Sequence, residues 1–264
     1  MPDFTKFRAG QFCWVDLMSK NMDAAKAFYT GLFGWSFEAM DTQGSPPYGA
    51  LTKGGKIACG IGQMTGEMKD AGMPAMWNSY VSVEDVAATC DAVTAAGGKV
   101  FCPPMQIMDA GHMAVVQDPQ GAAVSLWQPG TTRGVQVANE EATWCWGEVM
   151  TPDAEAAKSF YGQVFGWTFE QDTNNPSQYW MAKLGDRTVG GVMQMDDSMQ
   201  GVPPHWSVYF QTADVPGMCE AIKSLGGSVH FGPFDSRVGP IAICADSEGG
   251  SFNLIGFQGE MDGE

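Results

Sequence analysis

The sequence predicts an α+β protein of two tandem domains, built from four βαβββ units. The 264-residue chain is about twice as long as a typical domain, and it contains a long internal repeat. Within each copy, a short apolar run precedes an amphipathic helical segment, and further β-rich runs follow. These observations together indicate a duplicated fold in which each copy is itself made of two similar halves.

The internal repeat is clearest at the start of each copy. Residues 12–38 (FCWVDLMSKNMDAAKAFYTGLFGWSFE) align with residues 144–170 (WCWGEVMTPDAEAAKSFYGQVFGWTFE) at an offset of 132. The offset then falls to 129, where Trp77 and Tyr80 match Trp206 and Tyr209, and to 128, where Asp118 matches Asp246. We therefore expect domains at residues 8–130 and 142–260, joined by the polar connector PGTTRGVQVANEEA.

The first copy shows the order of elements in each domain. Its first half predicts a strand at Phe12–Met18, a helix capped by Asn21 or Asp23 and ended by Gly34, and strands at 48–52 and 57–64. Its second half predicts a strand at 77–83, a helix from Glu84 to Ala96 and strands at 99–102, 113–117 and 122–127. The second half therefore follows the order βαβββ, and we expect the same order in the first half, where two of the three later strands are located.

Composition and charge exclude several classes of partner. The net charge of −16 argues against nucleic acid and against an anionic membrane surface, because both need clustered Lys and Arg. No apolar run is long enough for a membrane span, and the N-terminus lacks the apolar core of a signal peptide. The seven cysteines form no CxxC pair, so we expect a reducing, cytoplasmic location with neither a disulfide framework nor a zinc–thiolate site.

Three motifs of the first copy carry a resemblance to a known family. The segments FYTGLFGW, VSVEDVAATCDAVTAAGGKV and QDPQGAAVSLWQ resemble the vicinal oxygen chelate superfamily, which includes glyoxalase I, extradiol dioxygenases and bleomycin-resistance proteins. The openings WVDLM and WGEVM look most like tandem two-domain glyoxalase-like proteins of bacteria. The resemblance covers almost the whole chain, and it implies one cupped eight-stranded sheet per domain around a small-molecule cavity.

The same resemblance implies where metal-using members of the superfamily hold their ligands. In this sequence those positions are Trp14, Asn78 and Ser125 in the first domain and Trp146, Ser207 and Asn253 in the second. The remaining ligand position falls in 57–64 or 189–195, and neither segment contains Asp, Glu or His. Divalent ions prefer imidazole and carboxylate ligands, so we expect no metal and no other cofactor in either domain.

Strand alternation predicts which side chains line the two cups, because positions two apart share a face. The expected lining of the first cup is Trp14, Asp16, Met18, Asn78, Tyr80, Ser125 and Trp127. For the second cup it is Trp146, Glu148, Met150, His205, Ser207, Tyr209 and Asn253. The same alternation puts Phe12 and Trp144 on these faces. Aromatic walls with a few convergent polar groups are typical of small-molecule sites.

Asp16 and Glu148 are the candidate catalytic residues, with His205 as a partner of Glu148. A carboxyl group on an apolar concave face is desolvated, which raises its pKa and makes it a usable acid or base. The alternative is that each carboxyl accepts a hydrogen bond from a neighbouring Trp or Tyr and only supports the fold. His205 follows two prolines, so it also fits a solvated position at the rim of the strand.

The sequence therefore favours a metal-independent glyoxalase-like protein that binds a small, partly aromatic organic molecule in one or both cups. Proton-shuttle chemistry of an isomerase or lyase is one extension, and sequestration of an antibiotic or toxin is an alternative. A metal-dependent lyase or dioxygenase of the same superfamily is a further alternative. We expect a monomer or homodimer whose partner is a small molecule.

Overall fold

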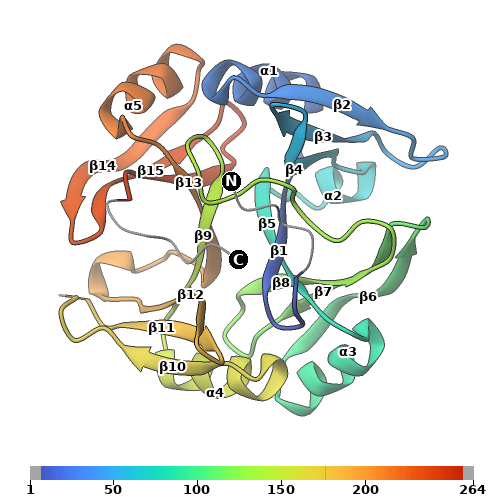
Figure 1. The fold of residues 1–264 in the computed structure, drawn as a ribbon, viewed down its shortest axis with the longest axis vertical. Helices are drawn as coiled ribbons and strands as arrows, with labels where there is room; N and C mark the ends of the chain where they lie inside the picture. Colours follow the sequence, from blue (N-terminus) through green and yellow to red (C-terminus); the bar gives the residue numbers. More distant parts are fainter. Residues whose placement is uncertain (1–6, 176, 258–264) are drawn as a thin grey trace.

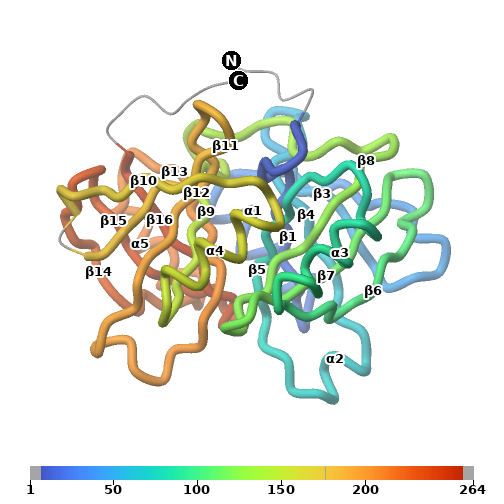
Figure 2. The backbone as a smooth tube through the Cα atoms, turned by 90° about the horizontal axis from the view of Figure 1, so that it is seen from below, coloured from blue at the N-terminus to red at the C-terminus, as the bar shows by residue number. Residues whose placement is uncertain are grey.

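The computed structural model describes residues 7–175 and 177–257, and these form two similar halves that lie side by side (Figure 2). The first half contains one eight-stranded sheet in the order β2-β3-β4-β1-β5-β8-β7-β6. The second half repeats it in the order β10-β11-β12-β9-β13-β16-β15-β14. Both sheets are cupped and remain open at their edges, which confirms the predicted α+β class.

The elements of the first half include each segment expected from the sequence, together with β2 and the short helix α2, which the sequence analysis did not locate. They are β1 (Phe12–Ser19), α1 (Met22–Phe33), β2 (Ser36–Met40), β3 (Tyr48–Lys53), β4 (Lys56–Gln63), α2 (Gly66–Asp70), β5 (Met76–Ser82), α3 (Val86–Ala95), β6 (Lys99–Ile107), β7 (Gly111–Gln117) and β8 (Ala123–Pro129). Asn21 caps α1 by accepting from the Ala24 amide, and Gly34 ends it in the left-handed conformation at φ 68°.

The second half repeats this order. Its elements are β9 (Trp144–Thr151), α4 (Ala154–Phe165), β10 (Thr168–Gln171), β11 (Tyr179–Leu184), β12 (Arg187–Gln194), the short 3-10 helix η1 (Asp197–Met199), β13 (His205–Gln211), α5 (Val215–Ser224), β14 (Ser228–Ser236), β15 (Gly239–Ala245) and β16 (Ser251–Ile255). The predicted domain limits 8–130 and 142–260 stay a prediction, and residues 258–260 of the second lie outside the described residues.

The helix-bearing faces of the two sheets pack together into one shared core. In Figure 1, α1 lies beside α5 and α3 lies beside α4, so each helix pair joins the two halves. Phe12 of β1 packs edge-on against Trp206 of β13, and Trp77 of β5 packs edge-on against Phe210. One continuous cluster of buried residues therefore spans both halves.

Two equivalent polar contacts cross between the halves inside this core. The Tyr161 hydroxyl of α4 donates to the Asp118 carboxylate at 2.9 Å, and the Tyr29 hydroxyl of α1 donates to Asp246 at 2.9 Å. Asp118 also accepts from the backbone amides of Gly121 and Ala122, so the turn before β8 is tied to the other half. These contacts hold the halves in one fixed orientation and leave both concave faces pointing away from the shared core.

Membrane-spanning helices are not found in the described part of the chain, where every helix is too short or too polar for that role.

Candidate functional site

The buried carboxyl of Asp16 is the centre of the first concave face. Asp16 lies in the middle of β1, opposite Gly60 of β4 and Asn78 of β5, and it is 2% exposed. The hydroxyls of Tyr48 and Tyr80 both donate to its Oδ2 at 2.9 Å, and the Asn78 amide donates to its Oδ1 at 2.9 Å. The Trp14 indole N–H in turn donates to the Tyr48 hydroxyl at 3.1 Å.

The buried carboxyl of Glu148 is the equivalent centre of the second concave face. It lies opposite Gly191 of β12 and Ser207 of β13, and it is 6% exposed. Tyr179 donates to its Oε2 at 2.9 Å, Tyr209 donates to its Oε1, and the Trp146 indole donates to the Tyr179 hydroxyl at 3.0 Å. Each cup therefore contains the same hydrogen-bonded chain, from Trp to Tyr to carboxyl.

Glycines on the neighbouring strands make room for the tyrosines. A Cβ at Gly60 would stand 2.0 Å from the Tyr48 hydroxyl oxygen, and one at Gly191 would stand 1.9 Å from that of Tyr179. A side chain at either position would push the hydroxyl away from its carboxyl. The glycines therefore allow the ring of β3 or β11 to cross over β4 or β12 and reach the first strand of its half.

Burial changes the acidity of every group in these two clusters. Desolvation raises the pKa of Asp16 and of Glu148 above their ordinary values, although the hydrogen bonds donated to each carboxylate partly offset the rise. Desolvation and the adjacent carboxyl raise the pKa of Tyr80 and Tyr209 well above 10. The tyrosines therefore act as proton donors in hydrogen bonds at neutral pH, and the carboxyls are the groups whose protonation can change.

The other predicted lining residues lie on the same faces, as the strand registers show. Tyr80 pairs with Trp14 and with Ser125, and Tyr209 pairs with Trp146 and with Asn253. Next to the carboxyls, Met18 and Met150 occupy equivalent positions farther along the first strands. Most of these side chains are buried, whereas Met18, Asn78, Trp146 and His205 are half-buried.

His205 and Glu148 are not brought together. His205 lies opposite Met150 at the start of β13, and its Nδ1–H donates to the Pro203 carbonyl at 2.9 Å. The hydrogen bonds of the described residues include none between His205 and Glu148, because Ser207 is the residue opposite the glutamate. His205 thus lies at the rim of the second cup with its Nδ1 proton fixed by the backbone.

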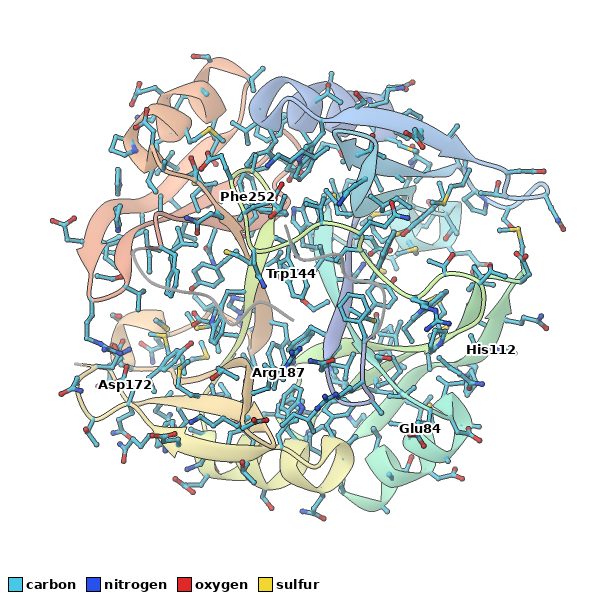
Figure 3. All side chains as sticks on the ribbon, in the orientation of Figure 1. Glu84, His112, Trp144, Asp172, Arg187 and Phe252 are labelled. Carbon is cyan, nitrogen blue, oxygen red and sulfur yellow. The ribbon has the colours of Figure 1, made fainter. Side chains whose placement is uncertain are left out.

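Strict alternation gives the wrong face for Phe12 and Trp144. The register shifts between Phe12 and Trp14 and again opposite Tyr209 and Phe210, so each first strand carries a bulge near its start. Phe12 and Trp144 turn to the shared core, where their rings pack edge-on at 6.4 Å. Figure 3 shows Trp144 near the middle of the molecule, where the halves meet.

Tyr48 and Tyr179 are site residues that the sequence analysis missed. They start β3 and β11, which are not among the strands that carry the family's ligand positions. A signal for them was present: they match each other across the repeat at an offset of 131, and Gly60 and Gly191 do the same. A repeated Tyr facing a repeated Gly on the next strand indicates a ring that crosses the sheet.

The chemistry of the cup residues does not fit a divalent metal ion. Each cup offers one carboxyl, whose two oxygens already accept hydrogen bonds from the protein, and its other groups are hydroxyls, amides and indole donors. The second cup adds one imidazole at its rim, that of His205, whose Nδ1 is bonded to the Pro203 carbonyl. Within residues 7–175 and 177–257, no group of three or more His, Cys, Asp or Glu side chains lies close enough to hold an ion. Metals of the kind used by this fold prefer several imidazole and carboxylate ligands.

Comparisons with known proteins identify the family of the chain. The family model described as the Glyoxalase/Bleomycin resistance protein/Dioxygenase superfamily matches residues 11–126 and 144–254. The protein named "Putative glyoxylase CFP32" of Mycobacterium tuberculosis is 38% identical over 258 residues, which cover 97% of this chain and 98% of the relative. "Anthracycline biosynthesis protein DnrV" of Streptomyces peucetius is 31% identical over 265 residues, which cover 95% of this chain and 94% of the relative.

Solved structures with low identity share the fold. The Mn(II)-bound glyoxalase of Novosphingobium aromaticivorans superposes with a TM-score of 0.64 at 15% identity, covering 97% of this chain and 85% of that one. The 2,3-dioxygenase LapB of Pseudomonas superposes with a TM-score of 0.62 at 13% identity, covering 96% and 95%. The chain therefore belongs to the glyoxalase/bleomycin resistance protein/dioxygenase superfamily, with two glyoxalase-like sheets in tandem.

Proposed function

We propose that this protein is a metal-independent member of the superfamily that binds a small, partly aromatic organic molecule in a cup and moves a proton on it with a buried carboxyl. The observation that carries the proposal is the Trp–Tyr–carboxyl chain, which stands at the same register position in both halves. In the first cup, an acidic group with a raised pKa and fixed hydrogen-bonding neighbours lies among the positions at which the family resemblance implies metal ligands, opposite Asn78 and on the same strand as Trp14.

The chemistry of this arrangement suits proton transfer next to a carbonyl group. A buried carboxyl whose pKa is raised is a stronger base than an exposed one, so it can accept a proton from a carbon of the ligand and return it to a neighbouring position of the ligand. A tyrosine hydroxyl that turns toward the ligand stabilises the negative charge that forms on the carbonyl oxygen meanwhile. Together these steps are those of an isomerase or lyase, with Glu148 or Asp16 as the proton carrier and Tyr209 or Tyr80 as the donor.

Two observations favour a ligand with an aromatic ring: the aromatic side chains that line the cups, and the name of one relative. Trp14 and Tyr80 line one face, and Trp146 and Tyr209 line the other, so a flat ring finds stacking partners in both. The relative from Streptomyces peucetius is named for anthracycline biosynthesis. The net charge of −16 disfavours strongly anionic ligands.

A second candidate function is sequestration without turnover. Both oxygens of each carboxyl already accept hydrogen bonds from the protein, which is what a purely supporting role would require. In that case the cups hold the ligand by stacking and shape, and the carboxyls keep the tyrosines in place. The same variants separate the two candidates.

The test uses 4′-hydroxyacetophenone, a small aromatic ketone whose methyl protons are acidic. Binding is followed by NMR, and exchange of the methyl protons is followed in D₂O with and without protein. We expect the wild-type protein to bind the probe and accelerate exchange, whereas Glu148→Gln and Asp16→Asn reveal which cup supplies the proton carrier. Loss of exchange with binding kept identifies the carboxyl as the carrier.

Two results count against the proposal. Saturable binding with no acceleration of exchange in the wild type would replace proton transfer by sequestration. Absence of any saturable binding of the probe would overturn the proposed function itself. Asn174→Ser, in an exposed turn after β10, is the control variant and should behave as the wild type.

A further inference from the structure

The two cups differ at several matched positions. Asp16 and Ser125 of the first cup have the larger Glu148 and Asn253 as counterparts, and two other exchanges change side-chain size in the opposite direction. Trp127 on β8, which pairs with Met113, has Ile255 as its counterpart on β16, where it pairs with Ile241. Asn78 on β5 has the smaller Ser207 as its counterpart on β13. Both exchanges replace a larger side chain of the first cup by a smaller one in the second.

The polar groups of the first cup satisfy one another. The Asn78 amide donates to Asp16, and the Trp127 indole N–H donates to the Thr132 carbonyl at 2.9 Å. Asp16 accepts from three side chains, and the Ser125 hydroxyl lies beside Tyr80, where it partly offsets the rise in that tyrosine's pKa. The carboxyl of Asp16, the amide nitrogen of Asn78 and the indole of Trp127 in the first cup therefore already have partners within the protein.

The second cup leaves polar groups without partners. Ser207 is 8% exposed and Asn253 is 4% exposed, and within the described chain neither side chain makes a hydrogen bond. The side-chain oxygen of Gln211, on the same strand as Ser207 and Tyr209, is buried and has no partner in the described residues either. Buried polar groups are normally paired, so the Gln211 oxygen lacks a partner that a ligand would supply, and the side chains of Ser207 and Asn253 have hydrogen-bonding capacity that the protein does not use.

An apolar wall stands beside these groups. Tyr209, Ile255 and Cys145 form a buried cluster that is separate from the shared core, and Trp146, Val238, Ile241 and Phe257 pack around it while partly exposed. Along β16 the alternate residues Phe252 and Leu254 point to the shared core, so Asn253 and Ile255 face the cup. Trp146 is half-buried, whereas its counterpart Trp14 is only 8% exposed.

From these differences we propose that the second cup is the ligand site and that the first cup supports the fold. The ligand is an uncharged aromatic molecule with a carbonyl acceptor and a hydroxyl donor on its edge. Its ring lies on the wall of Trp146, Tyr209 and Ile255, and its polar edge meets Ser207, Asn253 and Gln211. This inference rests on the proposed function and names the site and ligand class for it.

The location is tested on the intact protein with methyl-labelled methionine, using 4′-hydroxyacetophenone as the probe. Met150 reports on the second cup, and its counterpart Met18, together with Met113, reports on the first. Ring currents of the bound probe should shift the Met150 methyl signal in a saturable way and leave Met18 and Met113 unmoved. The matched compound 4-acetylbenzoate, which carries a negative charge in place of the hydroxyl, should bind at least about tenfold more weakly, a difference of about 1.4 kcal/mol.

Two variants convert the second cup into the first, one residue at a time. Ile255→Trp places the residue of the first cup into the wall and should weaken binding at least about tenfold. Asn253→Ser removes the unpartnered amide with less risk to folding and should weaken binding several-fold. Asn174→Ser is the same chemical change in an exposed turn and should leave the affinity unchanged, and circular dichroism confirms that each variant is folded.

The outcomes separate this inference from the function on which it rests. Saturable shifts at Met18 or Met113, alone or equal to those at Met150, would overturn the assignment to the second cup and leave the proposed function standing. Unchanged affinity in both Ile255→Trp and Asn253→Ser would also overturn the assignment. No saturable shift at any of the three methionines would overturn the assignment and the proposed function together.

Discussion

Substitution of Gly191 by Ala is the sharpest perturbation of the second cup, because it displaces a single hydroxyl. The new Cβ would stand 1.9 Å from the Tyr179 hydroxyl oxygen and 2.5 Å from Cζ of that ring. The ring must retreat by about 1 Å or more before an ordinary contact is restored. Gly191 does not have a positive φ, so Ala itself causes no backbone strain there.

The magnitude follows from the two hydrogen bonds that the retreat breaks. The bond from Tyr179 to Glu148 contributes about 1.5–3 kcal/mol as a bond to a carboxylate, and the bond from the Trp146 indole contributes about 1 kcal/mol. Replacing Gly by Ala returns about 0.4–1 kcal/mol through the unfolded chain. The net loss in the free energy of unfolding is about 2–3 kcal/mol, or roughly 5–10 °C in melting temperature.

Urea unfolding and thermal melting of Gly191→Ala measure this loss, with Gly66→Ala as the control. A Cβ at Gly66 meets nothing within 4 Å, so that variant should match the wild type or be slightly more stable. The double variant Gly191→Ala/Tyr179→Phe should be less destabilised than the sum of its parts by about 1–2 kcal/mol, because both changes remove the same hydrogen bonds. Additive losses, or a stable Gly191→Ala protein, would refute the reasoning.

Three further predictions concern charge, the contact between halves, and metals. Burial raises the pKa of Glu148 above its ordinary 4.5, so the folded protein binds this proton more tightly than the unfolded chain does. The free energy of unfolding should therefore fall as the pH rises from 4.5 through the raised pKa. Urea titrations at several pH values should show a weaker fall for Glu148→Gln. Asp118→Asn should lower the free energy of unfolding by about 2–4 kcal/mol, because the buried carboxylate accepts hydrogen bonds from Tyr161 and from backbone amides. A melting temperature equal to that of the wild type would contradict this prediction. Adding Mn²⁺, Ni²⁺ or Zn²⁺, or removing metals with a chelator, should leave the melting temperature unchanged. A rise in melting temperature with metal concentration would contradict the conclusion that the cup residues do not fit a divalent ion.

Repeat matching and strand alternation were sufficient to predict most of the site. The four βαβββ units, the Asn21 cap and the shared face of Asp16, Asn78 and Tyr80 follow from the positions of residues along the strands. These features depend on local chemistry, so a sequence pattern records them. The expectation that the metal ligands are missing rests on the sequence alone, because it is a matter of which side chains stand at the positions that the resemblance implies.

Features that depend on contacts between distant strands were harder to predict. Phe12 and Trp144 were expected in the cups, but a bulge in each first strand turns them into the core, and alternation alone cannot reveal a bulge. Tyr48 and Tyr179 escaped notice because their hydroxyls reach the carboxyls across an intervening strand. The position of His205 at the rim, apart from Glu148, is likewise set by cross-strand register.

Element-specific analysis of the metal content of the purified protein, prepared without chelators, tests the central claim most directly. If a hydrogen-bonded carboxyl–tyrosine cluster has taken the place of a metal centre, transition metals should be present only in traces far below one ion per chain. A stoichiometric transition metal that is lost in Asp16→Asn or Glu148→Gln would contradict the claim.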